Sequence, residues 1–170
     1  MKLLLLNIVF CCALLFWGYK EGYRLNVTPS LPRGIYQLST ESPARGDIVS
    51  FCISGDAADL ARSRGYLQAG SCPSGLRPLM KRLAAMPGDK VIVSEKSISC
   101  CSSGGFCCLW PVVPLKTDRK GRPLAAAPIR GIVPDRMALV LTRHPGGFDS
   151  RYYGFVPLES LQKMEPVFTF

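Results

Sequence analysis

"PLMKRLAAMPGD", Pro78 to Asp89, is an apolar run that contains a lysine and ends at a proline and a glycine. If it forms a β-strand, alternation places Lys81 on the same face as Leu79 and Leu83. Arg82 then points to the opposite face. Burial among apolar side chains would lower the pKa of the lysine, and a neutral lysine can serve as a general base. A surface lysine on an edge strand is the simpler alternative, and these residues alone leave both open.

Other segments beyond residue 45 are typical of short β-strands, because they are apolar or β-branched and are bounded by Gly, Pro or Asp. They cover Gly46–Ile53, Asp89–Ser94 and Met137–Thr142. The polar "SEKS" at Ser94–Ser97 suits a hairpin turn. The segment "DAADLARSR", Asp56–Arg64, suits a short helix that ends at Gly65. The sequence therefore predicts a mainly β domain with one short helix.

An uncharged apolar stretch, "LLLLNIVFCCALLFWGY", occupies Leu3–Tyr19. As a helix its seventeen residues would span roughly 25 Å, at the short end for a hydrocarbon core of about 30 Å. A cleavable signal peptide is the alternative, but aromatic residues at the end of the stretch are typical of an uncleaved anchor. They are Phe16, Trp17, Tyr19 and Tyr23. We therefore expect an N-terminal transmembrane anchor over residues 1–20 and a further domain over residues 21–170.

Six cysteines follow the apolar stretch, and an even number in a small domain suggests disulfides formed in an oxidising compartment. The stretch "CCSSGGFCC" offers adjacent pairs, whereas zinc sites usually have two to four residues between ligands. We expect Cys52 to pair with Cys72, because one ends a predicted strand and the other follows the predicted helix. The pairing of Cys100, Cys101, Cys107 and Cys108 cannot be deduced. They belong to a cysteine-stapled excursion of irregular structure and short strands near residues 99–134.

The net charge of +9 raises the question of a nucleic-acid partner. The Lys and Arg residues are scattered, no basic run reaches five residues, and no aromatic residues interleave with them as in single-strand binding platforms. A basic surface that faces anionic lipid head groups accounts for the charge. We therefore expect no nucleic-acid partner, and we expect neither a cofactor nor a metal.

The segment "TPSLPRG", Thr28 to Gly34, forms a stiff turn that holds Ser30 between two prolines. A Ser-His-Asp triad would have to use His144, the only histidine, which lies beside proline and glycines with no evident acid partner. A loop histidine without a special role is the favoured interpretation. A serine nucleophile would then need a lysine as its base.

Three motifs occur in one order: S-x-P-x-G after the apolar stretch, "KRLAAMPGD", and "DSRYYG" near the end. In this they resemble the membrane-bound Ser/Lys signal peptidases, and above all the conjugative-transfer branch, the pilin-maturing peptidases of type IV secretion. Segments typical of that branch are Gly22–Leu38, Arg64–Pro73 and Phe148–Pro157. The resemblance covers nearly the whole chain, and "CCSSGGFCC" departs from it.

The resemblance implies that Ser30 is the nucleophile and Lys81 the general base. It implies a supporting catalytic role for Asp149, for which the alternative is a structural partner of Arg151 or of a loop N–H. The hydroxyl of Thr28 stands where a general signal peptidase has an oxyanion donor, a kind of group worth about 3 kcal/mol in the transition state. Arg82 and the turn Pro87, Gly88 and Asp89 correspond to scaffold around the lysine strand.

The resemblance also implies a signal-peptidase-like antiparallel β domain, tethered by a single transmembrane helix and lying on the periplasmic side of a bacterial inner membrane. The expected function is a monomeric serine endopeptidase that removes a signal or propeptide from a membrane-inserted precursor, a conjugative pilin. Some relatives also cyclise the pilin. The alternatives are a general preprotein signal peptidase I and, in another class, a non-enzymatic, disulfide-stapled component of a secretion or pilus assembly.

Overall fold

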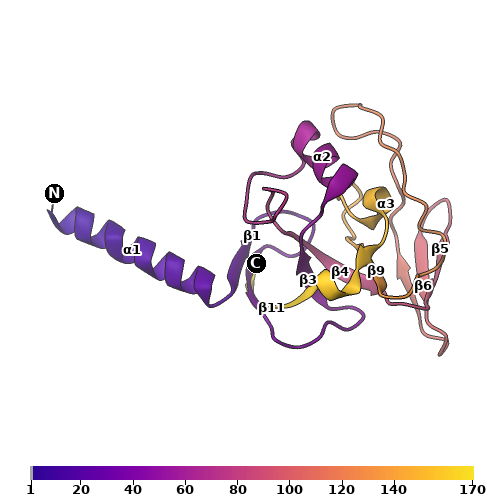
Figure 1. The fold of residues 1–170 in the computed structure, drawn as a ribbon, viewed down its shortest axis with the longest axis horizontal. Coiled ribbons are helices and arrows are strands. Elements are labelled where there is room, and N and C mark those ends of the chain that lie inside the picture. The colour runs from indigo at the N-terminus through magenta and orange to yellow at the C-terminus, as the bar shows by residue number, and fades with distance from the viewer. Residues whose placement is uncertain (1) are drawn as a thin grey trace.

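The computed structural model describes residues 2–170, and one long helix projects from a domain built mainly of strands (Figure 1). Within these residues the strands form a seven-stranded and a four-stranded sheet. The larger sheet has the order β1 (Tyr23–Asn26), β2 (Gly34–Leu38), β11 (Gln162–Thr169), β3 (Ile48–Phe51), β4 (Leu79–Ala85), β9 (Met137–Leu141) and β10 (Val156–Pro157). The smaller sheet has the order β7 (Cys107–Trp110), β6 (Ile98–Cys101), β5 (Lys90–Val93) and β8 (Gly131–Ile132). Neighbouring strands pair antiparallel, which confirms the mainly β antiparallel fold.

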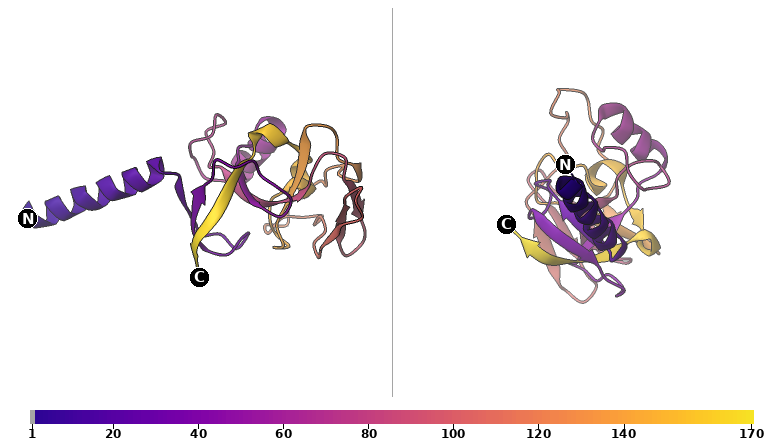
Figure 2. Two further views of the ribbon diagram at one scale, coloured as in Figure 1. Left: turned by 90° about the horizontal axis from the view of Figure 1, so that it is seen from below. Right: turned by 90° about the vertical axis from the view of Figure 1, so that its left-hand side faces the viewer.

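The helix α1 (Lys2–Lys20) exposes apolar side chains along its length, and Figure 2 shows that it points away from both sheets. Arg24 holds its junction with β1, because the guanidinium donates to the Tyr19 carbonyl at 2.8 Å and lies 4.1 Å from the Tyr19 ring centroid. Among residues 2–170, no helix combines the length and the apolar character needed to cross a membrane. The transmembrane anchor expected over residues 1–20 is therefore not confirmed, and Met1 lies outside the described residues.

The strand β4 lies in the interior of the larger sheet, between β3 and β9. Leu79, Lys81 and Leu83 are all buried, as the predicted alternation requires. Arg82 is half-buried and donates to the carbonyl of Gly46 at 2.9 Å. The edge-strand alternative is wrong, because β4 has a hydrogen-bonded neighbour on each side.

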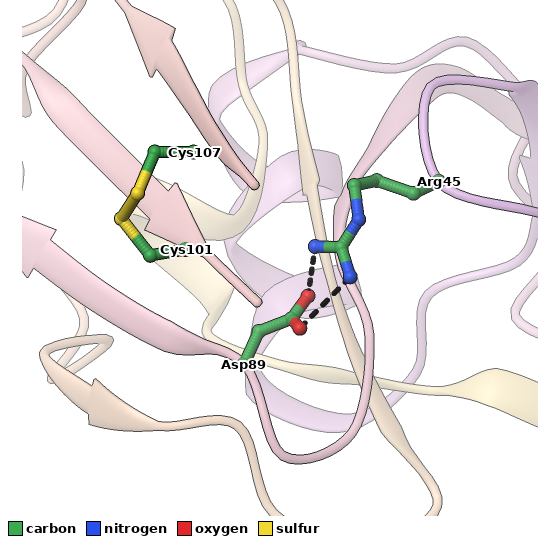
Figure 3. The surroundings of a disulfide bond; sticks show 4 residues. All are labelled: Arg45, Asp89, Cys101 and Cys107. Atoms are coloured by element: carbon green, nitrogen blue, oxygen red, sulfur yellow. Dashed lines mark hydrogen bonds and ion pairs between the residues drawn. A yellow bond between two sulfur atoms is a disulfide. The ribbon is translucent and has the colours of Figure 1, made fainter. Parts of the chain in front are cut away.

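The turn after β4 is fixed by its own glycine and aspartate. Gly88 has φ +81°, a conformation that glycine adopts without strain, and its N–H donates to the Val133 carbonyl at 3.0 Å. The buried carboxylate of Asp89 accepts from the Met86 N–H at 2.6 Å and forms an ion pair with Arg45 (Figure 3). These contacts agree with the scaffold role expected for this turn.

Strands β1, β2 and β11 were not predicted. The first half of β11 pairs with β3 and its second half with β2, and the register shifts between Pro166 and Phe168. Proline cannot donate a ladder hydrogen bond and is uncommon inside sheets, so the sequence around Pro166 did not indicate a strand. β1 and β2 lead into and out of residues 27–33, so this pairing sets the two ends of the loop that carries Ser30.

The helix α2 (Gly55–Arg64) confirms the predicted helix, and Gly65 ends it in the left-handed conformation at φ +69°. A second short helix, α3 (Ser150–Tyr153), was not predicted, so the expectation of one short helix was wrong. Its four residues are too few to show helical periodicity. Asp149 caps this turn by accepting from the Arg151 N–H at 3.1 Å.

Within the described residues, the disulfide Cys52–Cys72 confirms the predicted pairing, with Cα atoms 5.6 Å apart. A second disulfide, Cys101–Cys107, joins β6 to β7 inside the predicted excursion (Figure 3). Cys100 and Cys108 lie opposite each other in the same strand pair and are free thiols. The predicted turn at residues 94–97 is also present, since Ser94 and Ser97 close the β5–β6 hairpin.

Replacing both Cys52 and Cys72 by alanine should lower the free energy of unfolding by about 3 kcal/mol, because the cross-link restricts the unfolded chain over a sequence separation of 20 residues. The measurement is urea unfolding of the variant and of the oxidised wild-type protein. An unchanged midpoint would show that this disulfide does not stabilise the fold.

Candidate functional site

Ser30 and Lys81 line the same pocket, whose volume is about 610 Å³. The loop between β1 and β2 supplies Ser30, and the first half of β4 supplies Lys81. Segments that follow α2 and β9, together with the turn at residues 115–124, complete the walls. Two positions that are 51 apart in the sequence (81 − 30) therefore meet in one cavity.

Lys81 is the most unusual ionisable group of this pocket, because its side chain is almost completely buried, with 4% exposed. Burial lowers the pKa of Lys81 to about 8, the charge of Asp149 acts to raise it, and that of Arg151 acts to lower it. No ion pair involving Lys81 is present among residues 2–170. A lysine with this pKa is partly neutral near pH 8 and can accept a proton.

The loop that carries Ser30 is tied to the strand β9 side of the pocket by Thr142, which sequence analysis did not single out. The hydroxyl of Thr142, which is buried, donates to the backbone carbonyl of Ser30. The N–H of Thr142 donates to Asp149 at 3.0 Å. A single threonine just after an apolar strand gives no sequence signal for this contact.

Asp149 is fully buried and does not line the pocket. Its carboxylate accepts from the Arg151 guanidinium at 2.8 and 2.9 Å and from the N–H groups of Arg151 and Thr142. The same guanidinium also donates to the carbonyls of residues 113, 144, 145 and 147. These are the contacts that the structural alternative expects, and the only effect on Lys81 described for Asp149 is that of its charge on the lysine pKa.

Thr28 is exposed and lines the pocket together with Ser30. Its hydroxyl donates to the side-chain oxygen of Asn26 at 2.8 Å. In this conformation the hydroxyl proton of Thr28 is occupied, so it does not point to an oxyanion. The backbone N–H of Ser30 is the other candidate donor on this loop, because the neighbouring Pro29 has no N–H.

His144 also lines the pocket, which the sequence did not predict for a loop histidine. Its backbone N–H donates to the Thr142 hydroxyl at 3.2 Å. In the described chain no carboxylate hydrogen-bonds to its ring, so there is no Ser-His-Asp arrangement. Residues 2–170 also contain no cluster of three or more His, Cys, Asp or Glu suited to a metal ion.

One wall of the pocket is a turn organised by Asp118, another residue that sequence reasoning missed. Its carboxylate accepts from the Tyr66 hydroxyl at 2.7 Å, from the Arg122 guanidinium at 2.7 Å and from the N–H of Lys120 at 2.9 Å. Burial acts to raise the pKa of Asp118, but these hydrogen bonds hold it well below the usual range. The turn is thereby fixed to Tyr66, just beyond the end of α2.

The chain matches the family described as signal peptidase, peptidase S26, over residues 2–165. It is 36% identical over 172 residues to a conjugal transfer protein TraF of Agrobacterium tumefaciens, covering 95% of this chain and 91% of the relative. It is 31% identical over 157 residues to a plasmid transfer protein TraF of Escherichia coli, covering 89% of this chain and 85% of the relative. A crystal structure of a signal peptidase I from Enterococcus faecalis is similar with a TM-score of 0.41 at 21% identity, covering 77% of this chain and all of that one.

Proposed function

Because this chain belongs to the signal peptidase family, peptidase S26, we propose that it is a serine endopeptidase with Ser30 as nucleophile and Lys81 as general base. The observation that carries the proposal is the buried Lys81, with a pKa lowered to about 8, in the pocket that also holds Ser30. The substrate is a membrane-inserted precursor from which a signal or propeptide is removed.

In the proposed reaction, neutral Lys81 takes the proton of the Ser30 hydroxyl while the serine oxygen attacks the carbonyl carbon of the scissile bond. The tetrahedral oxyanion is held by the N–H of Ser30. When the intermediate collapses, the C–N bond breaks, and the amine leaves with the proton that Lys81 held. Water then adds to the ester of the acyl-enzyme while Lys81 takes one of its protons. The ester C–O bond breaks, and Lys81 returns the proton to the oxygen of Ser30.

We propose a pilin precursor as the substrate, since relatives of high coverage carry the names conjugal transfer protein and plasmid transfer protein. An amine of the same pilin chain can replace water in the second step, and the product is then cyclic. Mass spectrometry separates the two outcomes, because the cyclic product lacks the mass of one water.

Co-expression of the candidate pilin precursor with wild-type protein or with Ser30→Ala tests this function. We expect a shortened pilin with the wild type and an intact precursor with the variant. An acylating inhibitor should label Ser30 in the wild type alone. If the wild-type protein is folded but neither cleaves the precursor nor accepts the label, the chain is a non-enzymatic component instead.

We further propose that α1 holds the protein at the bacterial inner membrane, with the domain on the periplasmic side. The helix exposes large apolar side chains between Leu4 and Tyr19, and basic residues are scattered over the domain. Beside its end, three exposed apolar residues continue across the sheet, because Leu25 of β1 and Phe168 of β11 both pair with Ile35 of β2. Such a surface is suited to the interfacial region of a bilayer.

A variant that lacks residues 2–20 should move from the membrane pellet to the soluble fraction, whereas the full chain should stay in the pellet after a high-salt wash. The reason is that salt weakens charge attraction but leaves the burial of apolar side chains intact. The measurement is fractionation followed by mapping of the amino terminus. Release of the full chain by salt, or a mature terminus beyond Tyr19, would contradict the proposal.

A further inference from the structure

We propose that Asn26 is a positioning residue that fixes the Ser30 loop, residues 27–33, in its reactive conformation. This inference rests on the proposed function, since it concerns how the nucleophile is held. Asn26 is the last residue of β1, where it pairs with Gly34 of β2, and its side chain lies inside the loop that these strands enclose. With 5% of its surface exposed, it is a buried polar residue that requires hydrogen-bond partners.

The side-chain amide of Asn26 contacts the loop on both sides of Ser30. Its nitrogen lies 3.1 Å from the carbonyl of Thr28, 3.2 Å from that of Leu31 and 3.0 Å from that of Pro32. Its oxygen accepts from the N–H of Thr28 at 3.1 Å and from the Thr28 hydroxyl at 2.8 Å. One planar group therefore joins the residue two places before the serine to the first and second residues after it.

The backbone of the loop contributes few hydrogen bonds of its own. Pro29 and Pro32 have no N–H, so the segment cannot form its own ladder of backbone hydrogen bonds. No backbone-to-backbone hydrogen bond of good geometry joins two residues of the segment 27–32. Other side chains reach single carbonyls only: Tyr36 donates to Pro32 at 2.6 Å, and Thr142 donates to Ser30. Within the described residues, the Asn26 side chain is thus the one group that contacts the loop at several residues.

The chemistry of the contact requires a carboxamide, which donates and accepts at once. Aspartate has the same shape but offers only acceptor oxygens when ionised. In Asn26→Asp an oxygen would face the carbonyls of Thr28, Leu31 and Pro32, and the loop would have to rearrange to avoid it. A displacement of about 1 Å in a reacting group can cost about 100-fold in rate, so the serine should react more slowly.

The test compares Asn26→Asp with Val91→Ala, a matched control that weakens the core beneath the smaller sheet, away from the pocket. Both are assayed well below their unfolding temperatures for acylation of Ser30 and for precursor cleavage. For Asn26→Asp we expect the acylation rate and kcat to fall by about 10- to 100-fold, with little change in KM and in the pH midpoint set by Lys81. Val91→Ala should acylate at the wild-type rate.

Equal acylation rates in wild type and Asn26→Asp would overturn the inference, and so would an equal loss in Val91→Ala. If Asn26→Asp does not fold, Asn26→Ala, which removes the donors without adding a charge, is compared in the same way. If neither Asn26 variant folds while Val91→Ala does, Asn26 serves the fold as a whole and the inference fails. A wild-type protein that is not labelled at Ser30 would instead refute the proposed function, so the two failures are distinguishable.

Discussion

Lys81→Met should abolish precursor cleavage while keeping the fold, and Lys81→Arg should be equally inactive. Methionine fills the apolar site of the lysine but cannot accept a proton. Arginine keeps the charge and does not lose its proton in a protein. We expect the residual cleavage to be at least about 100-fold below wild type, within the range that a general base contributes. The control is Lys90→Arg on β5, where the lysine is exposed and outside the pocket.

The wild-type cleavage rate should rise with pH through about 8, because the neutral form of Lys81 increases there. The stability of the fold should change over a different window. The pKa of Lys81 falls from 10.5 to about 8 on folding, so between these values the unfolded state binds more protons than the folded state. Stability contributed by this group therefore rises with pH across that window, and Lys81→Met should lack this rise.

A folded Lys81→Arg that cleaves the precursor would refute the Ser/Lys assignment.

The face of β4 on which Lys81 lies could be predicted because it depends on local pattern, whereas its burial could not, because the residues alone also fitted a surface lysine. Alternation in β4 puts Leu79, Lys81 and Leu83 on one face whatever the partner strands are. The helix α2 and its terminal glycine are local in the same sense. The Cys52–Cys72 pair followed from the short path between the end of a strand and the turn after that helix.

Features that depend on which strands pair, and in which register, could not be predicted. The strand β11 lies between β2 and β3 in the sheet, although more than one hundred residues separate it from them in the sequence. Its proline also makes the segment look unlike a strand. The partner of Cys101 is set by the register of β6 on β7, which places Cys107 opposite it. That register depends on how the excursion packs, which spacing alone does not reveal.

Polar residues that organise the pocket also gave no signal. Asn26 is the last residue of β1 and Thr142 directly follows β9, and a polar residue at such a position ordinarily marks only the end of a strand. Their roles arise from carbonyls that the proline-rich Ser30 loop leaves without backbone donors. The prolines indicate that the loop carbonyls need side-chain donors, but only the fold shows which residues supply them.

Asp149→Asn should lower the free energy of unfolding by about 3–5 kcal/mol, because it removes one partner of a fully buried ion pair and leaves the charge of Arg151 uncompensated. Its matched control is Asp59→Asn, which breaks an exposed pair with Arg62 and should cost no more than about 1 kcal/mol. Urea unfolding of both variants measures the difference. Equal, small losses in the two variants would show that the Asp149–Arg151 pair does not hold the fold.

The same variant also separates a structural from a catalytic role of Asp149. Its carboxylate accepts from the N–H of Thr142, and the hydroxyl of Thr142 in turn donates to the carbonyl of Ser30. Asparagine keeps an oxygen that can accept from the N–H of Thr142, so Thr142 should still hold Ser30 in place in the folded variant. We therefore expect folded Asp149→Asn to acylate Ser30 within about 10-fold of wild type, whereas a carboxylate that supports Lys81 directly would cost as much as a general base does. A stable, folded and unreactive Asp149→Asn would move this residue from the scaffold into the catalytic group.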